Sequence, residues 1–96
     1  MAERLYLVAY DIRSPRRWRR VYRLLLGYGS WVQLSIFQCR LSAQRHATLS
    51  GAVDGLIDHR EDQVLFVDLG PAEAAEPRFT SFGRRYAEPQ ANPVVV

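Results

Sequence analysis

The stretch Leu5-Tyr6-Leu7-Val8-Ala9-Tyr10-Asp11-Ile12 decides the fold of this 96-residue chain. Apolar residues occupy both of its alternating faces, which is typical of a central strand that is buried on one face and largely covered on the other. Ser14 and Pro15 follow, and these residue types favour the start of a helix. The sequence therefore predicts a buried strand that leads directly into a helix.

This first helix is predicted to be amphipathic and to stop at Gly27 and Gly29. At 100° per residue its apolar side chains share one arc: Trp18, Val21, Tyr22, Leu25 and Tyr28. The opposite arc carries only arginines: Arg16, Arg19, Arg20 and Arg23. Arg17 falls on a flank, and we expect it to be the arginine that leans toward Asp11.

The hydrophobic pattern and the turn and capping residues predict four further elements. Residues 31–41 are extended, as one bent strand or as a tight pair of strands. Ser42 caps a second helix of about fifteen residues. Residues 63–69 and 78–86 are predicted to be strands, separated by an acidic loop.

This order indicates an α+β fold: a ferredoxin-like βαββαβ sandwich with an additional C-terminal strand, in which two helices cover one face of an antiparallel sheet. We expect residues 1–86 to form this domain and residues 87–96 to form a tail. The tail ends in the apolar stub Val94-Val95-Val96. A monomer would leave such a stub exposed, so we predict that it pairs with a sheet edge of a partner subunit, and that the protein is a homodimer.

The charge is divided unevenly along the chain. All thirteen basic residues are arginine, and nine of them lie in residues 1–53 with only Glu3 and Asp11 as acids. That half is therefore about +7, while residues 54–96 are about −4, with four arginines and eight acids. Arginine holds phosphate oxygens in pairs, so this asymmetry favours a nucleic acid or another polyphosphate as the partner of the basic half.

Asp11 is the candidate site residue, because it ends the predicted central strand beside the arginine helix. An aspartate at this place is also typical of an ordinary turn, and the residues alone leave both interpretations open. One carboxylate makes a poor Mg²⁺ site. A symmetric dimer that brought two copies of Asp11 together would supply the second carboxylate.

Other chemistries have little support in the sequence. There is no Walker-type phosphate loop and no Gly-x-Ser-x-Gly motif. His46 and His59 lack metal-ligand spacing, and the single Cys39 is expected to be buried. Asp54, Asp58 and Asp62 are expected to form a solvated helix end. No signal peptide or membrane span is predicted, so we expect a cytoplasmic protein without a membrane partner.

The first strand, the arginine helix and the later stretch Val32-Gln-Leu-Ser-Ile-Phe-Gln-Cys39 together resemble a known family. It is the second CRISPR-associated protein, the small subunit of the spacer-acquisition machinery. The resemblance continues through a capped second helix, an Asp-rich turn before a Val-x-Phe strand, and Gly83-Arg84. It spans nearly the whole chain, and the order and spacing of its short motifs are fairly specific.

The resemblance implies a ferredoxin-like homodimer that bridges two dimers of the CRISPR integrase and holds a DNA duplex on a basic surface. Many members of the family are also described as Mg²⁺-dependent endonucleases of RNA or DNA, with Mn²⁺ as an alternative metal. The family's metal-binding aspartate corresponds to Asp11, one copy from each protomer, and Ser35 and Phe37 occupy positions near the dimer axis. Phe37 and Trp31 are alternatively base-stacking or core residues.

Two hypotheses about function follow. In the first, Asp11 is the catalytic and metal-binding residue of an endonuclease or endoribonuclease. In the second, the protein is a non-catalytic DNA-binding scaffold that bridges integrase dimers. Both assign nucleic-acid binding to the same residues: Arg13, Arg16, Arg17, Arg19, Arg20 and Arg23.

Overall fold

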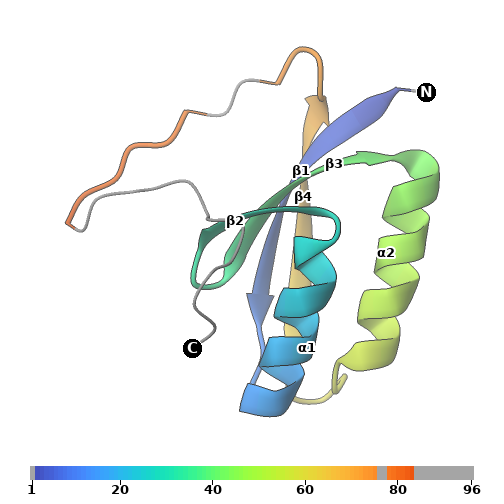
Figure 1. Cartoon of the computed structure of the whole chain (residues 1–96), viewed down its shortest axis with the longest axis vertical. Helices are drawn as coiled ribbons and strands as arrows, with labels where there is room; N and C mark the ends of the chain where they lie inside the picture. The colour runs from blue at the N-terminus through green and yellow to red at the C-terminus, as the bar shows by residue number, and fades with distance from the viewer. Residues whose placement is uncertain (1, 76–77, 84–96) are drawn as a thin grey trace.

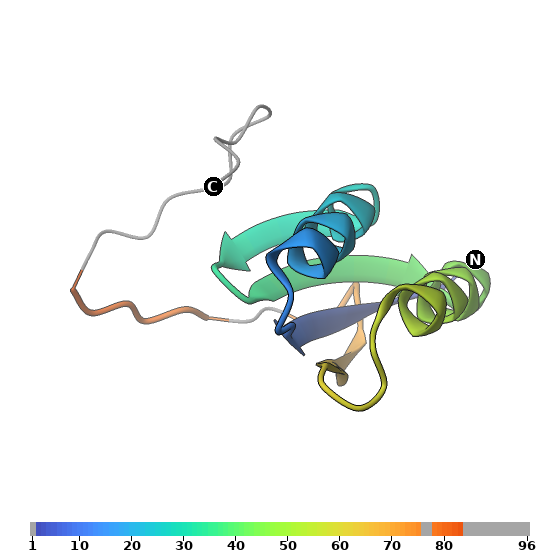
Figure 2. The same ribbon diagram turned by 90° about the horizontal axis from the view of Figure 1, so that it is seen from below.

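The computed structural model describes residues 2–75 and 78–83. Its elements are β1 (Glu3–Asp11), α1 (Pro15–Leu26), β2 (Gly29–Gln33), β3 (Ile36–Ser42), α2 (Ala43–Leu56) and β4 (Gln63–Pro71). The strands form one four-stranded sheet in the order β2-β3-β1-β4, and every neighbouring pair is antiparallel. Both helices lie on the same face of this sheet (Figures 1 and 2). The predicted ferredoxin-like βαββαβ sandwich is confirmed.

Local signals set the ends of both helices. The Ser14 hydroxyl accepts a hydrogen bond from the Arg17 backbone N–H, and the Ser42 hydroxyl accepts one from Arg45. Gly27 caps the end of α1, and its N–H donates to the carbonyls of the last turn. The two helix starts and the first helix end were therefore predicted correctly.

Residues 31–41 form the tight pair rather than one bent strand. Leu34 and Ser35 are the turn between β2 and β3, and Trp31 lies opposite Phe37 in the register. The ladder is irregular between Trp31 and Gln33. This strand pair carries the sheet out to its β2 edge.

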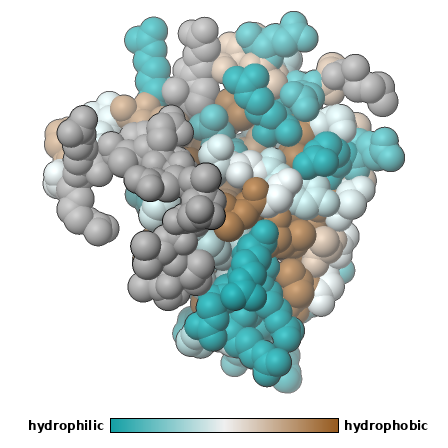
Figure 3. Space-filling view, viewed as in Figure 1, coloured by the Kyte–Doolittle hydropathy of each residue, from teal (hydrophilic) through white to brown (hydrophobic). Residues whose placement is uncertain are grey.

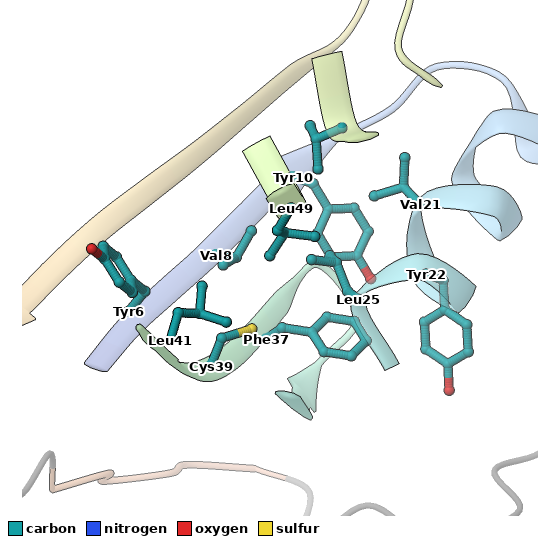
Figure 4. Close-up of a cluster of buried hydrophobic side chains, with 11 residues drawn as sticks. Tyr6, Val8, Tyr10, Val21, Tyr22, Leu25, Phe37, Cys39, Leu41 and Leu49 are labelled. Carbon is teal, nitrogen blue, oxygen red and sulfur yellow. The ribbon is translucent and has the colours of Figure 1, made fainter. Parts of the chain in front are cut away.

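The core lies between the sheet and the two helices (Figure 4). Alternate residues of β1 point into it, namely Tyr6, Val8 and Tyr10. They pack with Phe37, Cys39 and Leu41 of β3, Val21, Tyr22 and Leu25 of α1, and Leu49 and Val53 of α2. The intervening residues of β1, including Ala9 and Asp11, therefore belong to the opposite face of the sheet, which neither α1 nor α2 covers (Figure 2).

The predicted strand over 78–86 is wrong for residues 78–83, which are not part of the sheet. Alternating side chains make a segment compatible with a strand, but a strand exists only where its backbone finds an edge to pair with. Residues 84–86 and the tail 87–96 lie outside the described residues, so the pairing of Val94–Val96 with a partner stays a prediction. No helix in the described part of the chain is long and apolar enough to cross a bilayer.

Gly29 is required by the close approach of β2 to β3. A methyl group at Gly29 would lie 2.5 Å from Cys39 Sγ and 2.9 Å from Cys39 Cα, and would also clash with the carbonyl oxygen of Gln38. We expect Gly29→Ala to lower the free energy of unfolding by about 1–3 kcal/mol, as overpacking does. Denaturant titration followed by circular dichroism measures the change.

Gly51→Ala is the matched control, because nothing lies within 4 Å of the added methyl group. In the interior of α2 this substitution should stabilise the protein by up to about 1 kcal/mol, since alanine favours the helix. Equal effects of the two substitutions would contradict the steric explanation for Gly29.

Candidate active site and nucleic-acid surface

Asp11 is the last residue of β1 and lies opposite Gln63, the first residue of β4. Its side chain is exposed, and the strand alternation places it on the helix-free face of the sheet. No ion pair or hydrogen bond of the Asp11 carboxylate exists among residues 2–75 and 78–83. The carboxylate is thus presented to solvent rather than used to stabilise the turn that follows it.

Tyr10 fastens the β2–β3 turn beside Asp11. Its backbone N–H donates to the Ser35 carbonyl at 3.0 Å, and its hydroxyl donates to the Leu34 carbonyl at 2.9 Å. Burial raises the pKa of Tyr10 well above its usual range, so the phenol stays protonated and keeps this donor. The position of Ser35 relative to Asp11 is therefore fixed by a buried side chain of the neighbouring residue.

An open pocket of about 240 Å³ surrounds Asp11 on this face. It is lined by Ala9, Tyr10, Asp11, Gln33, Ser35, Ile36, Gln63 and Leu65. The pocket brings together two residues predicted from the sequence, Asp11 and Ser35. It also contains Gln33 and Gln63, which sequence reasoning did not select, although the strand register could have indicated Gln63.

The donors around this pocket are of the kind that Mg²⁺ prefers. Carboxylate, hydroxyl and amide oxygens are hard ligands, and the pocket lining includes neither a thiol nor an imidazole. In the described residues, however, no group of three or more His, Cys, Asp or Glu side chains converges. Among the described residues, Asp11 is therefore the single carboxylate that this pocket supplies.

Phe37 does not line this pocket. Its side chain is fully buried in the core on the helix side of the sheet, where it packs against Tyr10 and Tyr22. The base-stacking interpretation of Phe37 is therefore wrong. Trp31 is partly buried against the same core.

The back of α1 is a surface of exposed arginines. It consists of Arg16, Arg19, Arg20 and Arg23, which we call the arginine row. Within the part of the chain that the structure describes, none of these guanidinium groups forms an ion pair. Figure 3 shows hydrophilic surface over α1, beside apolar surface toward α2. The four arginines of the predicted arginine back are thus exposed and unpaired among the described residues, and their role in binding nucleic acid stays a prediction.

The prediction that Arg17 leans toward Asp11 is wrong. Its Nε donates to Asp62 Oδ2 at 2.8 Å, and its Nη2 donates to Glu61 Oε1 at 3.0 Å. A helical projection places Arg17 on a flank, but it carries no information about the α2–β4 turn that approaches this flank. The charge of Arg17 is thus compensated within the chain.

Asp62 is the residue that sequence reasoning missed. Its side chain is fully buried, with 0% exposure, and is not part of a solvated helix end. The carboxylate also accepts hydrogen bonds from the backbone N–H groups of Arg13 at 3.0 Å and Asp58 at 2.8 Å. No local sequence signal marks this role, because its donors at the start of α1 lie about 45 residues away in the chain.

The remaining candidate groups have structural partners. His46 stacks on Tyr6, with ring centroids 4.7 Å apart, and meets Phe66 edge-on. His59 Nε2 lies 3.0 Å from the Asp54 carbonyl. Burial raises the pKa of the Cys39 thiol to about 11, which makes it unreactive.

Comparison with known proteins identifies the family to which these features belong. Residues 4–76 match the model of the family described as CRISPR associated protein Cas2. The chain belongs to the Cas2 family. Two relatives named CRISPR-associated endoribonuclease Cas2 are each 48% identical: that of Geobacter sulfurreducens, over 88% of this chain and 88% of the relative, and the first Cas2 of Rhodospirillum rubrum, over 88% and 83%.

Solved structures support the same assignment. Streptococcus pyogenes Cas2 superposes with a TM-score of 0.73 at 28% identity, and the match covers 82% of this chain and 99% of that one. A hypothetical protein from Thermus thermophilus gives a TM-score of 0.75 at 30% identity, with 88% and 99% covered. The family resemblance and the fold predicted from the sequence are both confirmed.

The buried Asp62 should make this Cas2-family protein sensitive to acid. The Arg17 side chain holds the pKa of Asp62 well below its ordinary value of 3.8. The ionised carboxylate therefore contributes stability above about pH 4, and this contribution is lost as the pH falls toward the lower folded pKa. Unfolding free energies measured by denaturant titration between pH 7 and pH 2 should show the decline.

Asp62→Asn should lower the free energy of unfolding by about 1–3 kcal/mol at pH 7, because it removes the charge that Arg17 and the two backbone N–H groups bind, and should flatten the dependence on pH in this range. Asp68→Asn is the control, because the Asp68 and Arg4 side chains are 45% and 49% exposed and their ion pair should matter much less. Parallel pH profiles of the wild type and Asp62→Asn would contradict this account.

Proposed function

We propose that this protein is a metal-dependent endonuclease of RNA or DNA that acts in CRISPR spacer acquisition as a homodimer. The observation that carries the proposal is the Asp11 pocket: an unpartnered carboxylate at the end of β1, beside a fixed Ser35 and among oxygen donors. The relatives in Geobacter sulfurreducens and Rhodospirillum rubrum are named endoribonucleases, which supports a nuclease of the same kind here.

The helix-free face of the sheet supports the dimer. Leu65, Val67 and Leu69 of β4 are 50%, 45% and 37% exposed, and alternation places all three on this face. A contiguous apolar surface of this kind marks an interaction site. Packing two copies through this face would place Asp11 of each at the interface, because the Asp11 pocket shares Leu65 with the apolar surface.

The outer edge of β4 supports the proposed role of the tail. β4 is an edge strand of nine residues, and among the described strands it pairs only with β1. A partner's residues 94–96 would add a short strand there.

In the proposed reaction, Asp11 of each protomer would hold a Mg²⁺ ion, with Mn²⁺ as an alternative, and the ion would supply charge neutralisation and acidify a water molecule. The arginine row lies on the other side of the sheet, so it would bind backbone phosphates farther along the nucleic acid rather than those beside the scissile one. Ser35 and the amides of Gln33 and Gln63 lie where they can orient the phosphate oxygens. The water oxygen would form the new bond to phosphorus and release a proton to solvent, while the bond from phosphorus to the leaving sugar oxygen breaks and that oxygen takes up a proton from solvent.

A second candidate function is a scaffold that holds nucleic acid between CRISPR integrase dimers without cutting it. The observation that favours it is the absence of a general base near Asp11 among the described residues. His46 and His59 are both engaged elsewhere, and neither lines the pocket. The uncompensated arginine row serves binding equally well with or without cleavage.

Asp11→Asn tests the catalytic proposal, because it removes the charge without changing the size of the side chain. We expect loss of Mg²⁺-dependent cleavage of labelled RNA and DNA by at least about 100-fold, while nucleic-acid binding is kept. Asp54→Asn is the matched control, since Asp54 is 75% exposed and lies on α2.

Mixing the two forms sharpens this test. If the site needs one Asp11 from each protomer, excess Asp11→Asn chains should suppress wild-type activity as mixed dimers form. Cleavage by purified Asp11→Asn at the wild-type rate would remove Asp11 from the mechanism. Binding without cleavage by the wild type would favour the scaffold.

Val67→Asp tests the proposed dimer face. A carboxylate at the centre of an apolar interface would be buried without a partner, so the dimer should dissociate at least about tenfold more readily. Sedimentation equilibrium measures the dissociation constant. Leu26→Asp is the control, because Leu26 is 37% exposed at the end of α1, on the opposite side of the sheet. Equal dimerisation of the wild type and Val67→Asp would contradict this interface.

A further inference from the structure

Asp62 is the centre of a group of contacts that we call the Asp62 clasp, made of Asp62, Glu61, Arg17 and the backbone N–H groups of Arg13 and Asp58. Asp62 Oδ2 accepts from Arg17 Nε at 2.8 Å and from the Asp58 N–H at 2.8 Å. Asp62 Oδ1 accepts from the Arg13 N–H at 3.0 Å and from Arg17 Nη2 at 3.3 Å. Both carboxylate oxygens therefore have two donors each.

The clasp joins the segment at the start of α1 to the turn before β4, which is distant from it in sequence. The Arg13 N–H lies two residues after Asp11, Arg17 lies in the first turn of α1, and Asp62 directly precedes β4. The link between Asp11 and α1 is thus tied at its middle to a buried carboxylate. The clasp restrains the backbone that leads from the candidate catalytic residue to the arginine row.

Because of the clasp, the charge of Arg17 is compensated, unlike the charges of the arginine row. Arg17 is 24% exposed and is paired with two carboxylates, Asp62 and Glu61. To bind a phosphate through Nε, Arg17 would have to leave a fully buried Asp62 carboxylate. Breaking a buried pair leaves an uncompensated charge and costs more than an exposed arginine–phosphate contact returns.

We propose that Asp62 is a positioning residue of the nucleic-acid surface: it withholds Arg17 from phosphate and fixes the segment between Asp11 and α1, so that backbone binding by α1 falls to the arginine row. This inference rests on the proposed nucleic-acid-binding function and divides the arginines of α1 into two classes. The arginine row binds phosphate, whereas Arg17 maintains the geometry of the site.

Salt dependence of duplex binding distinguishes the two classes. Each lost phosphate contact reduces the slope of log affinity against log salt by about 0.9 on double-stranded DNA. Fluorescence anisotropy with a 30-base-pair DNA of mixed sequence should therefore show a slope reduced by about 0.9 for Arg20→Gln. The matched variant Arg17→Gln should keep the wild-type slope.

Freeing Arg17 should have the opposite effect. Asp62→Asn removes the charge that holds Arg17, so the slope should become steeper by about 0.9, and the double variant Asp62→Asn/Arg17→Gln should return to the wild-type slope. A merely structural role of Asp62 would weaken binding in both variants and would not produce this reversal. The measurements are made below the melting temperature of each variant.

A measurement on the wild type shows whether Arg17 contacts phosphate even if a variant does not fold. In ¹⁵N spectra of the guanidinium groups, DNA should shift the Nε–H signals of the arginine row and leave the Arg17 signal in place. A slope reduced equally by Arg17→Gln and Arg20→Gln, or a shifted Arg17 signal, would overturn the inference. Failure of the wild type to bind DNA or RNA even at low salt would instead overturn the proposed function.

Discussion

The buried carboxylate of Asp62 is the interaction on which the site end of the molecule depends. Asp62 accepts from the backbone of Arg13 and Asp58 and from the side chain of Arg17. Without it, the loop after β1, the first turn of α1 and the turn before β4 would have no common anchor among the contacts described here. Each of its two oxygens accepts two hydrogen bonds. The carboxylate therefore holds these segments in a defined orientation as well as close together.

β1 serves two purposes, because its alternate side chains face two different environments. Tyr6, Val8 and Tyr10 pack under the helices, and the other face carries Ala9 and Asp11. Tyr10 connects the core with the candidate site. Its ring belongs to the core, while its backbone N–H and its hydroxyl hold the turn that carries Ser35. Stability and the geometry of the candidate site are therefore coupled through a single residue next to Asp11.

The features that could be predicted from the sequence are those with local physical causes. Ser14, Gly27 and Ser42 mark helix ends because capping needs only neighbouring residues, and the arcs of α1 follow from helical periodicity. The partner of Arg17 could not be predicted in this way, because it comes from a segment about 45 residues away in the chain. The strand expected over 78–83 failed for a related reason: pattern indicates compatibility with a strand, while pairing requires an available edge.

Asp11 and Asp62 are neighbours in the register, and strand alternation explains why their environments are opposite. Gln63 pairs with Asp11, so the side chains of both belong to the helix-free face. Asp62 is one residue earlier, and its side chain turns to the helix side, where it meets Arg17 of α1. One carboxylate is thereby buried and neutralised, and the other remains exposed and unpaired. A shift of β4 by a single residue would turn the Asp62 side chain to the helix-free face and away from Arg17, so the register of β4 against β1 determines whether this carboxylate can hold the fold.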